Sequence, residues 1–279
     1  LGNIVLLATA GQPGLRAVPF DCIEFNEDFR WIDTASEIAF TYVDLLDHGQ
    51  PGLACWLLNE WLVWSGDFDA LAVLRYYAVY RAMVRAKVAA LSGRPEESAG
   101  YLALAEALTL PAAPQLTITF GASGSGKTTR SSALLLAARR ADAASEHAGF
   151  AESRLIRLRS DVERKRLFGL AADADSGGSI YSAETGRRTY ARLEDLAAAA
   201  LADGWSVIVD AACLKRAERD RFHALAAGCG AGFSILACAA PPEELRRRLA
   251  ARRGDASEAD ASVLAHQLQW LEPLGDDEV

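Results

Sequence analysis

Residues 121–128 carry side chains whose types and spacing could hold a phosphate group. Gly121, Gly126, Lys127 and Thr128 fit the pattern G-x-x-x-x-G-K-[ST]. Glycines let the backbone curl around an anion with its N–H groups pointing inward. The lysine supplies positive charge for the β- and γ-phosphates of ATP, and the threonine hydroxyl is a suitable ligand for Mg²⁺. The predicted ATP-binding residues are Gly121, Ala122, Ser123, Gly124, Ser125, Gly126, Lys127, Thr128 and Thr129.

The segments on either side of this loop fit the same interpretation. Residues 116–120 are β-branched, aromatic or apolar and follow Pro111 and Pro114, which predicts a short buried strand. Residues 131–140 are strongly helix-forming, and a helix that opens at the loop directs its positive N-terminal dipole toward a phosphate. The alternative is a Gly/Ser linker that matches the pattern by chance.

A second group of chemical interest follows the predicted strand 154–160. Asp161 begins the next helix, so it should lie at the carboxyl edge of the sheet, where open α/β folds bind their ligands. Arg164 lies three residues later, on the same side of that helix. Here Asp161 could accept a proton from a hydroxyl while Arg164 holds an anionic group. The alternative role for Asp161 is simply to cap the helix.

Asp210 ends a third predicted strand, over residues 205–210. An aspartate in this position is typical of the carboxylate that supports Mg²⁺ near a phosphate-binding loop. Thr128 and Asp210 are therefore the predicted metal-binding residues, although a strand-ending aspartate can also be only a cap.

An arginine-rich helix is predicted over residues 241–254, with Pro and Glu at its start and Arg and Gly at its end. Such a helix could act as a lid that presents an arginine to a transferring phosphate. For any one arginine, a solvent-facing position is the alternative. The arginines concerned are Arg246, Arg247, Arg248, Arg252 and Arg253.

Strands and helices alternate after residue 111, which predicts an α/β fold with a parallel sheet and helices on both faces. The N-terminal part differs: two strands within residues 1–24 precede helices at 32–46, 53–64, 69–91 and 98–108. On the third of these helices we expect one face to point inward, made of Leu71, Leu74, Ala78, Tyr80, Met83 and Val84. The predicted division is residues 1–110 and residues 111–279.

Composition narrows the class of protein. The chain has 279 residues, 51% of them hydrophobic, and a net charge of −8, which argues against broad binding to nucleic acid or anionic membranes. The most apolar window, residues 53–64, is too short to span a bilayer, and no secretory signal is present. The five cysteines lack metal-binding spacing and predict free thiols in a cytoplasmic protein.

The first 92 residues resemble the rear part of the aminoglycoside phosphotransferase family, which has a protein-kinase-like fold. The resemblance rests on Asn3 before a strand, on Asp21 within Phe-Asp-Cys-Ile-Glu-Phe, and on residues 29–33 and 80–87. It implies that Asn3 and Asp21 match Mg²⁺-binding positions. The catalytic aspartate and nucleotide-binding lobe of that family would precede residue 1, so we expect this part to be incomplete and inactive.

Residues 116–279 resemble small P-loop kinases of the polynucleotide kinase, gluconate kinase and zeta toxin type. Asp161-x-x-Arg164 matches the acceptor-side motif in which the aspartate is the base, and Asp210 matches the aspartate ending the next strand. These kinases usually have one further strand, which we expect to be missing. The order of the two parts resembles bacterial bifunctional aminoglycoside phosphotransferase/ATP-binding proteins, also described as AAA family ATPases.

Taken together, the sequence predicts a Mg²⁺-dependent kinase that transfers the γ-phosphate of ATP to a hydroxyl, with Asp161, Lys127 and Arg164 as catalytic residues. An antibiotic, a sugar, a nucleoside and a polynucleotide 5′ end all remain open as acceptors, as does the oligomeric state. An ATPase module without an acceptor and a non-catalytic fragment are the alternatives.

Overall fold

The computed structural model describes residues 4–8, 15–20, 26–137, 153–177, 180–251 and 256–278. Asn3 and Asp21, the two N-terminal positions predicted to bind Mg²⁺, lie outside the described residues. Arg252 and Arg253 of the predicted lid helix, and residues 138–140 of the helix after the loop, lie outside them as well.

Four parallel strands form the central sheet, in the order β4-β5-β3-β6. Their bounds are β3 Gln115–Phe120, β4 Leu155–Arg159, β5 Ser206–Asp210 and β6 Gly232–Ala237. The two inner strands are rich in β-branched residues, and Ile118 and Val209 at their centres are fully buried. Residues buried on both faces are what a parallel sheet between two helical layers requires.

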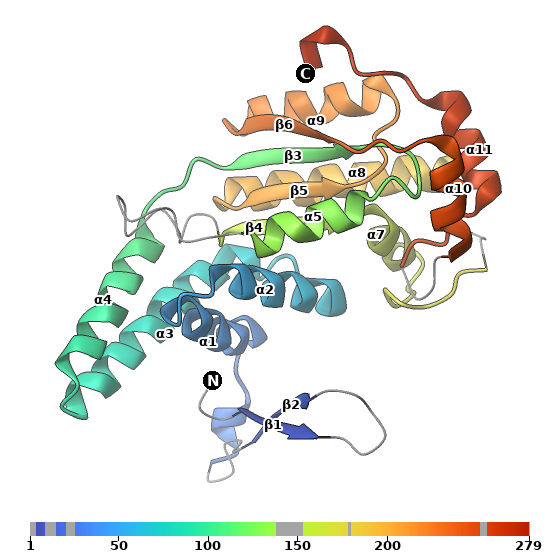
Figure 1. The fold of residues 1–279 in the computed structure, drawn as a ribbon. Coiled ribbons are helices and arrows are strands. Elements are labelled where there is room, and N and C mark those ends of the chain that lie inside the picture. The colour runs from blue at the N-terminus through green and yellow to red at the C-terminus, as the bar shows by residue number, and fades with distance from the viewer. Residues whose placement is uncertain are drawn as a thin grey trace.

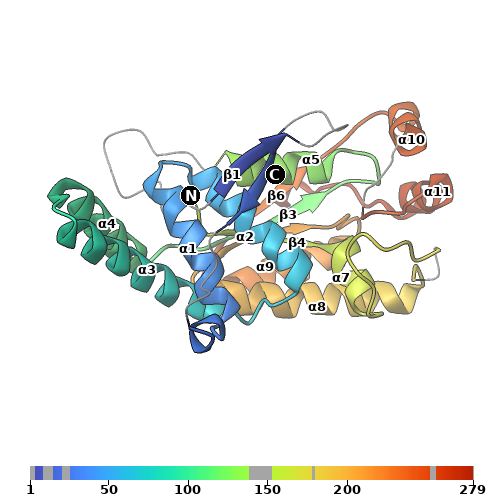
Figure 2. The same ribbon diagram turned by 90° about the horizontal axis from the view of Figure 1, so that it is seen from below.

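Helices cover both faces of this sheet, as predicted. On one face lies α5 (Lys127–Leu136), and on the other lie α8 (Ala183–Ala202) and α9 (Arg216–Gly228); Figure 2 shows the sheet between them. The short helix α7 (Ser160–Arg166) follows β4 directly. The helix after the phosphate-binding loop begins at Lys127, four residues earlier than the sequence pattern predicted, because its first turn is formed by the loop motif itself.

The N-terminal part is mostly helical, also as predicted. An antiparallel hairpin of β1 (Ile4–Ala8) and β2 (Leu15–Pro19) projects away from the helices and the sheet (Figure 1). The helices that follow are η1 Asp28–Arg30, α1 Thr34–Asp47, α2 Pro51–Ser65, α3 Leu71–Leu91 and α4 Pro95–Thr109. The Asp33 side chain caps the start of α1, and Gly66 ends α2 in the left-handed conformation.

One expectation about α3 was wrong. Tyr80 and Met83 are about half exposed, at 50% and 48%. The buried face of the helix begins with Leu71, Leu74 and Ala78, as predicted. It then continues through Ala82 and Ala86, whose small side chains let α1 and α4 approach closely. Small side chains on a packed helical face carry little hydropathy signal, so the larger residues beside them misled the prediction.

The helical part and the sheet share one hydrophobic core. A continuous cluster of buried side chains runs from Ala35 on α1 to Ala226 on α9. Hydrogen bonds also join the two parts: the Tyr42 hydroxyl is 2.9 Å from Ser153 Oγ, and Trp205 Nε1 donates to the Leu71 carbonyl. The Arg154 guanidinium donates to the Leu108 and Leu110 carbonyls at the end of α4. The helices therefore form part of the support of the sheet.

The C-terminal segment returns to the loop end of the sheet. Helices α10 (Pro242–Ala251) and α11 (Ala261–Trp270) pack on the loop through a cluster of Ala122, Leu245 and Leu264. The chain then closes with η2 (Asp276–Glu278). Within the described segments, no helix combines the length and apolar character needed to cross a membrane.

Candidate nucleotide-binding site

The loop between β3 and α5 has the backbone of a phosphate cradle. Gly121, Gly124 and Gly126 all have positive φ, at 146°, 83° and 93°. A Cβ on Gly121 would collide with the carbonyl oxygen of Cys238 on the neighbouring segment, so only glycine fits there. Gly126 is the N-cap of α5, and the loop thus delivers its N–H groups to the positive end of a helix.

Lys127 is held inside the loop that it follows. Its Nζ donates hydrogen bonds to the carbonyl oxygens of Gly121 at 2.9 Å and Ala122 at 3.0 Å. Burial lowers the pKa of the Lys127 ammonium, and the nearby carboxylates of Asp210 and Asp161 partly oppose that shift. The Lys127 ammonium therefore contacts the loop and lies near the carboxylates of Asp210 and Asp161.

Asp210 lies at the end of β5, directly behind the first turn of α5, and is only 5% exposed. The Ser131 hydroxyl is 3.0 Å from Asp210 Oδ2 and 3.1 Å from the carbonyl oxygen of Thr128. The Asp210 carboxylate and the loop threonine both offer oxygen ligands, which are the ligands that Mg²⁺ prefers.

Asp161 lies in the first turn of α7, at the carboxyl end of β4. Its Oδ1 accepts a hydrogen bond from Arg164 Nη1 at 2.9 Å, and the Arg164 guanidinium lies 4.8 Å from the centre of the Tyr181 ring. The helix N-cap is Arg159, with no side-chain capping bond, so capping is not what Asp161 does here.

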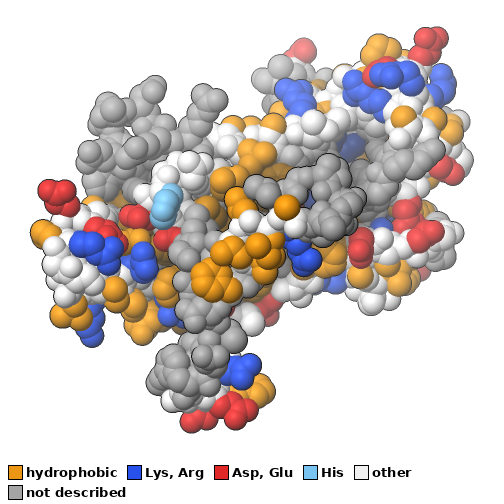
Figure 3. All heavy atoms as spheres, turned by 60° about the horizontal axis from the view of Figure 1, so that its bottom comes forward, with side chains coloured by type: hydrophobic (Ala, Val, Ile, Leu, Met, Phe, Trp, Pro, Cys, Tyr) orange, Lys and Arg blue, Asp and Glu red, His pale blue; other side chains and the backbone are white. Residues whose placement is uncertain are grey.

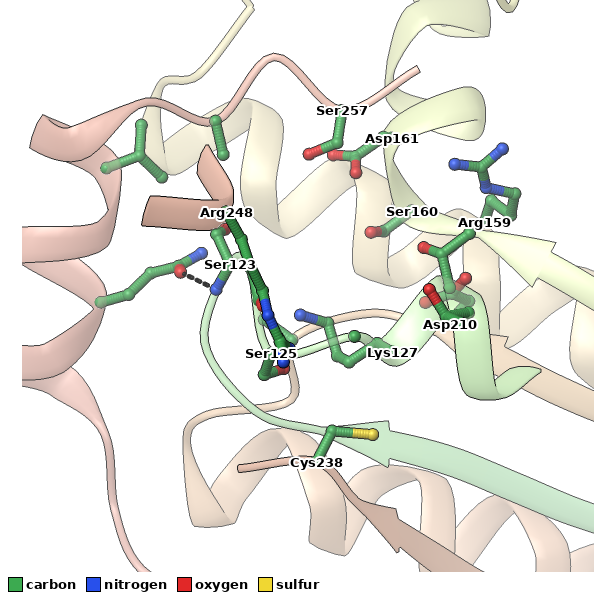
Figure 4. Close-up of a pocket in the computed structure, with 18 of the residues that line it drawn as sticks. Ser123, Ser125, Lys127, Arg159, Ser160, Asp161, Asp210, Cys238, Arg248 and Ser257 are labelled. Atoms are coloured by element: carbon green, nitrogen blue, oxygen red, sulfur yellow. Dashed lines mark hydrogen bonds between the residues drawn. The ribbon is translucent and has the colours of Figure 1, made fainter. Parts of the chain in front are cut away.

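All of these groups line one cavity of about 720 Å³ at the carboxyl edge of the sheet. Figure 4 shows Lys127 and Asp210 on one side of this space, Asp161 and Ser160 on another, and Arg248 reaching in from α10. Of the positions predicted to bind ATP, Ser123 to Thr129 line it, and Gly121 and Ala122 do not.

The arginines of α10 divide into two groups. Arg248 donates to the carbonyl oxygen of Gly124 at 3.3 Å, is paired with Glu244, and lines the cavity. Arg246 and Arg247 are exposed and do not line it. Figure 3 shows Lys and Arg side chains gathered at the upper right of the molecule. Among the described arginines of this helix, only Arg248 lines the cavity, and the lid role stays a prediction.

Sequence reasoning missed several residues at the site. The Gln267 side-chain oxygen on α11 accepts a hydrogen bond from the Ser123 backbone N–H at 2.7 Å. Tyr190 on α8 lines the cavity and accepts a hydrogen bond from the backbone N–H of Cys213, a non-glycine residue with positive φ. Burial raises the pKa of the Tyr190 hydroxyl well above its ordinary value. These contacts depend on distant segments and had no local signal.

The described residues fit a Mg²⁺–nucleotide complex better than a free-standing metal centre. They contain no group of three or more His, Cys, Asp or Glu side chains placed to hold an ion. Mg²⁺ commonly needs only one or two carboxylates, because phosphates and waters supply the remaining ligands.

The described cysteines are free thiols, in agreement with the sequence prediction; Cys22 lies outside the described residues.

Comparison with known proteins finds relatives that match most of this chain. Uncharacterized proteins of Mycobacterium tuberculosis and Mycobacterium bovis are 29% identical over 277 residues, which is 93% of this chain and 51% of theirs. The chain thus spans about half the length of the curated relatives it matches. A gluconokinase from Sinorhizobium meliloti has 22% identity and a TM-score of 0.38, covering 60% of this chain and 81% of its own.

A family model described as an AAA domain matches residues 116–274. That range begins with β3, contains the whole phosphate-binding loop and both site aspartates, and ends after α11. The match covers more than half of the chain and all of the elements that line the cavity. The chain belongs to the AAA domain family.

Proposed function

We propose that this chain is an ATP- and Mg²⁺-dependent phosphotransferase that acts on a hydroxyl acceptor. The observation that carries the proposal is the place of the Asp161–Arg164 pair, which lines the same cavity as the phosphate-binding loop. A module that only hydrolyses ATP needs the loop and a metal-binding carboxylate. A second carboxylate paired with an arginine, on the helix that follows a different strand, is what a separate acceptor requires.

Bound Mg²⁺ and ATP would supply the transferable γ-phosphate and the charge that draws electrons toward the leaving group. The loop amides and Lys127 would hold the phosphates, which requires Lys127 to exchange its bonds to Gly121 and Ala122 for phosphate oxygens. Thr128 and Asp210 would hold the metal. Arg248 lies close enough to the loop to neutralise charge on the transferring group.

Asp161 would accept the proton of the attacking hydroxyl, and Arg164 would orient the acceptor. Both side chains are partly exposed toward the cavity, at 24% and 13% of their surface, so a small molecule or nucleotide can reach them. The Tyr181 ring, stacked on the Arg164 guanidinium, restricts where that guanidinium can point. Because the Arg164 side chain then has fewer conformations available, it would hold the acceptor in one orientation.

For the N-terminal part we propose a relation to the rear part of the aminoglycoside phosphotransferase family, supported by its motifs and by the order of a hairpin followed by helices. We further propose a cytoplasmic location, on the basis of the free thiols of the described cysteines. The curated relatives are about twice as long as this chain. For a whole protein of that length, the activity and the partners are therefore also only proposed.

The proposal is tested first by thermal unfolding with and without Mg·ATP. Wild type should gain several degrees at a ligand concentration far above Kd, since ligand binding to the folded state alone stabilises it. Lys127→Ala should gain nothing. No shift in wild type would count against a working nucleotide site in this chain.

Asp161→Ala then separates transfer from binding. It should retain the thermal shift with Mg·ATP but lose phosphate transfer in an acceptor screen that uses radiolabelled ATP. If wild type hydrolyses ATP at a rate that Asp161→Ala leaves unchanged, and no acceptor is labelled, the alternative of an ATPase module without an acceptor is the better description.

A further inference from the structure

A buried arginine on β4 takes no part in the proposed reaction. Arg157 exposes only 3% of its side chain and lies between α2 and α5, on the face of the sheet that carries the phosphate-binding helix. Its guanidinium lies 5.8 Å from the centre of the Trp56 ring, and its Nη2 is 4.0 Å from Glu60 Oε1. Both of those partners belong to α2, in the N-terminal helical part.

The other side of the same guanidinium reaches α5. Arg157 Nη1 donates to Ser132 Oγ at 2.6 Å and to Ser131 Oγ at 3.4 Å. Ser131, which is fully buried, contacts Asp210 Oδ2 at 3.0 Å. An unbroken series of polar contacts therefore runs from α2, through Arg157 and Ser131, to the carboxylate that would hold the metal.

Stability alone does not account for an arginine at this position. Its only carboxylate partner among the described residues, Glu60, is at the outer limit of an ion pair and is 40% exposed. Its Nε is buried and has no hydrogen-bond partner among them. Buried ion pairs often contribute little net stability compared with well-packed apolar side chains, because the desolvation of the charges offsets their attraction. The arginine instead orients the Ser131 hydroxyl. Because Arg157 donates to Ser131 Oγ, the single hydroxyl proton of Ser131 points away from it, toward Asp210 or the Thr128 carbonyl.

We propose that Arg157 is a positioning residue for Asp210, and that through it the N-terminal helices set the Mg²⁺ affinity of the nucleotide site. The proposal rests on the proposed role of Asp210 in holding the metal. Arg157 fixes Ser131, and Ser131 fixes the carboxylate in the orientation that leaves an oxygen for the cation. Trp56 and Glu60 hold the guanidinium from the opposite side, so the packing of α2 determines where it sits.

The test is a Mg²⁺ titration of the binding of a fluorescent ATP analogue, with a parallel measurement of the Kd of that analogue in EDTA. Ser131→Ala, Arg157→Met and Arg157→Lys should each raise the Mg²⁺ concentration at half-saturation by about 10-fold or more, the scale seen when residues that orient a metal ligand are removed. The Kd in EDTA should stay at the wild-type value. The double variant Ser131→Ala/Arg157→Met should be no worse than the single ones, because both act on one carboxylate.

Tyr42→Phe is the matched control, since it removes a buried hydrogen bond between the helices and the sheet that does not lead to Asp210. It should lower Tm and leave the Mg²⁺ titration unchanged.

Ser131→Ala keeps the test decisive if the arginine variants fail to fold. If wild type needs Mg²⁺ and Ser131→Ala titrates like wild type, the positioning role is overturned while the proposed function stands. If wild-type binding is itself independent of Mg²⁺, the metal role of Asp210 fails and the positioning role with it.

Discussion

Gly121 shows how closely the site depends on single residues. Its φ of 146° and the carbonyl oxygen of Cys238, which occupies the space of a Cβ, both require glycine at the point where β3 turns into the loop. The Gly121 N–H donates to the Ala212 carbonyl at 3.0 Å, so the residue also joins the loop to the segment after Asp210. A change here should affect folding and nucleotide binding together.

Gly121→Ala should lower the free energy of unfolding by about 1–3 kcal/mol, the cost of a strained backbone position, and should abolish binding of Mg·ATP. Gly100→Ala is the control, because Gly100 lies on an exposed turn of α4 with no atom near its missing Cβ. That change should raise the free energy of unfolding by about 0.5–1 kcal/mol through helix propensity. Urea denaturation measures both, and equal effects of the two variants would contradict the assignment.

At the scale of elements, the contact between α2 and the edge of the sheet is the feature least expected from the sequence. Among the described strands β4 lies at the edge of the sheet, so its outer N–H and C=O groups face no described strand. The Asn59 side chain supplies both partners: its Oδ1 accepts from Arg157 N at 2.6 Å, and its Nδ2 donates to the Leu155 carbonyl at 2.8 Å. One side-chain amide thus takes the place of a neighbouring strand.

Asn59→Ala should therefore lower the free energy of unfolding by about 2–3 kcal/mol, because the Arg157 N–H would be left buried without a partner. Leu53→Ala on the same helix, at a position 48% exposed, should cost well under 1 kcal/mol. Chemical denaturation followed by circular dichroism compares the two. A small effect of Asn59→Ala would mean that water reaches this edge of the sheet.

At the scale of the whole molecule, the end of the described chain folds back onto the middle of it. Glu278 accepts hydrogen bonds from the Arg219 guanidinium on α9 at 2.6 and 2.9 Å. Arg219 is 1% exposed and lies 5.1 Å from the ring centre of Phe120, at the start of the phosphate-binding loop. The tail, α9 and β3 are thereby connected.

This contact gives a pH dependence with a definite sign. The hydrogen bond from Arg219 holds the pKa of Glu278 below its ordinary value of 4.5. A carboxyl group with a lowered folded-state pKa stabilises the fold above pH 4.5, and that contribution disappears as the pH falls through the folded-state pKa. The difference in unfolding free energy between wild type and Glu278→Gln should therefore be largest near pH 6 and shrink toward pH 3.

Short patterns in the sequence were enough to predict the local structure of the site. They predicted the loop motif, the strand before it, Asp161 at the start of a helix and Asp210 at the end of a strand, because each depends on residues adjacent in the chain. Parallel strands of an α/β sheet bring their carboxyl ends to one edge, so the meeting of these groups followed from the fold class. The catalytic and metal roles of these residues stay predictions until the variants are measured.

The tertiary structure decided everything that depends on distant packing. It selected Arg248 among the α10 arginines, brought Gln267 to the Ser123 N–H, and placed Asn59 and Arg157 between the helices and the sheet. It also joined the parts predicted as residues 1–110 and 111–279 through one core. A single polar residue in an apolar helix gives no local sign of its partner. Which buried group it meets is set by how whole elements pack, and that is decided only when the chain folds.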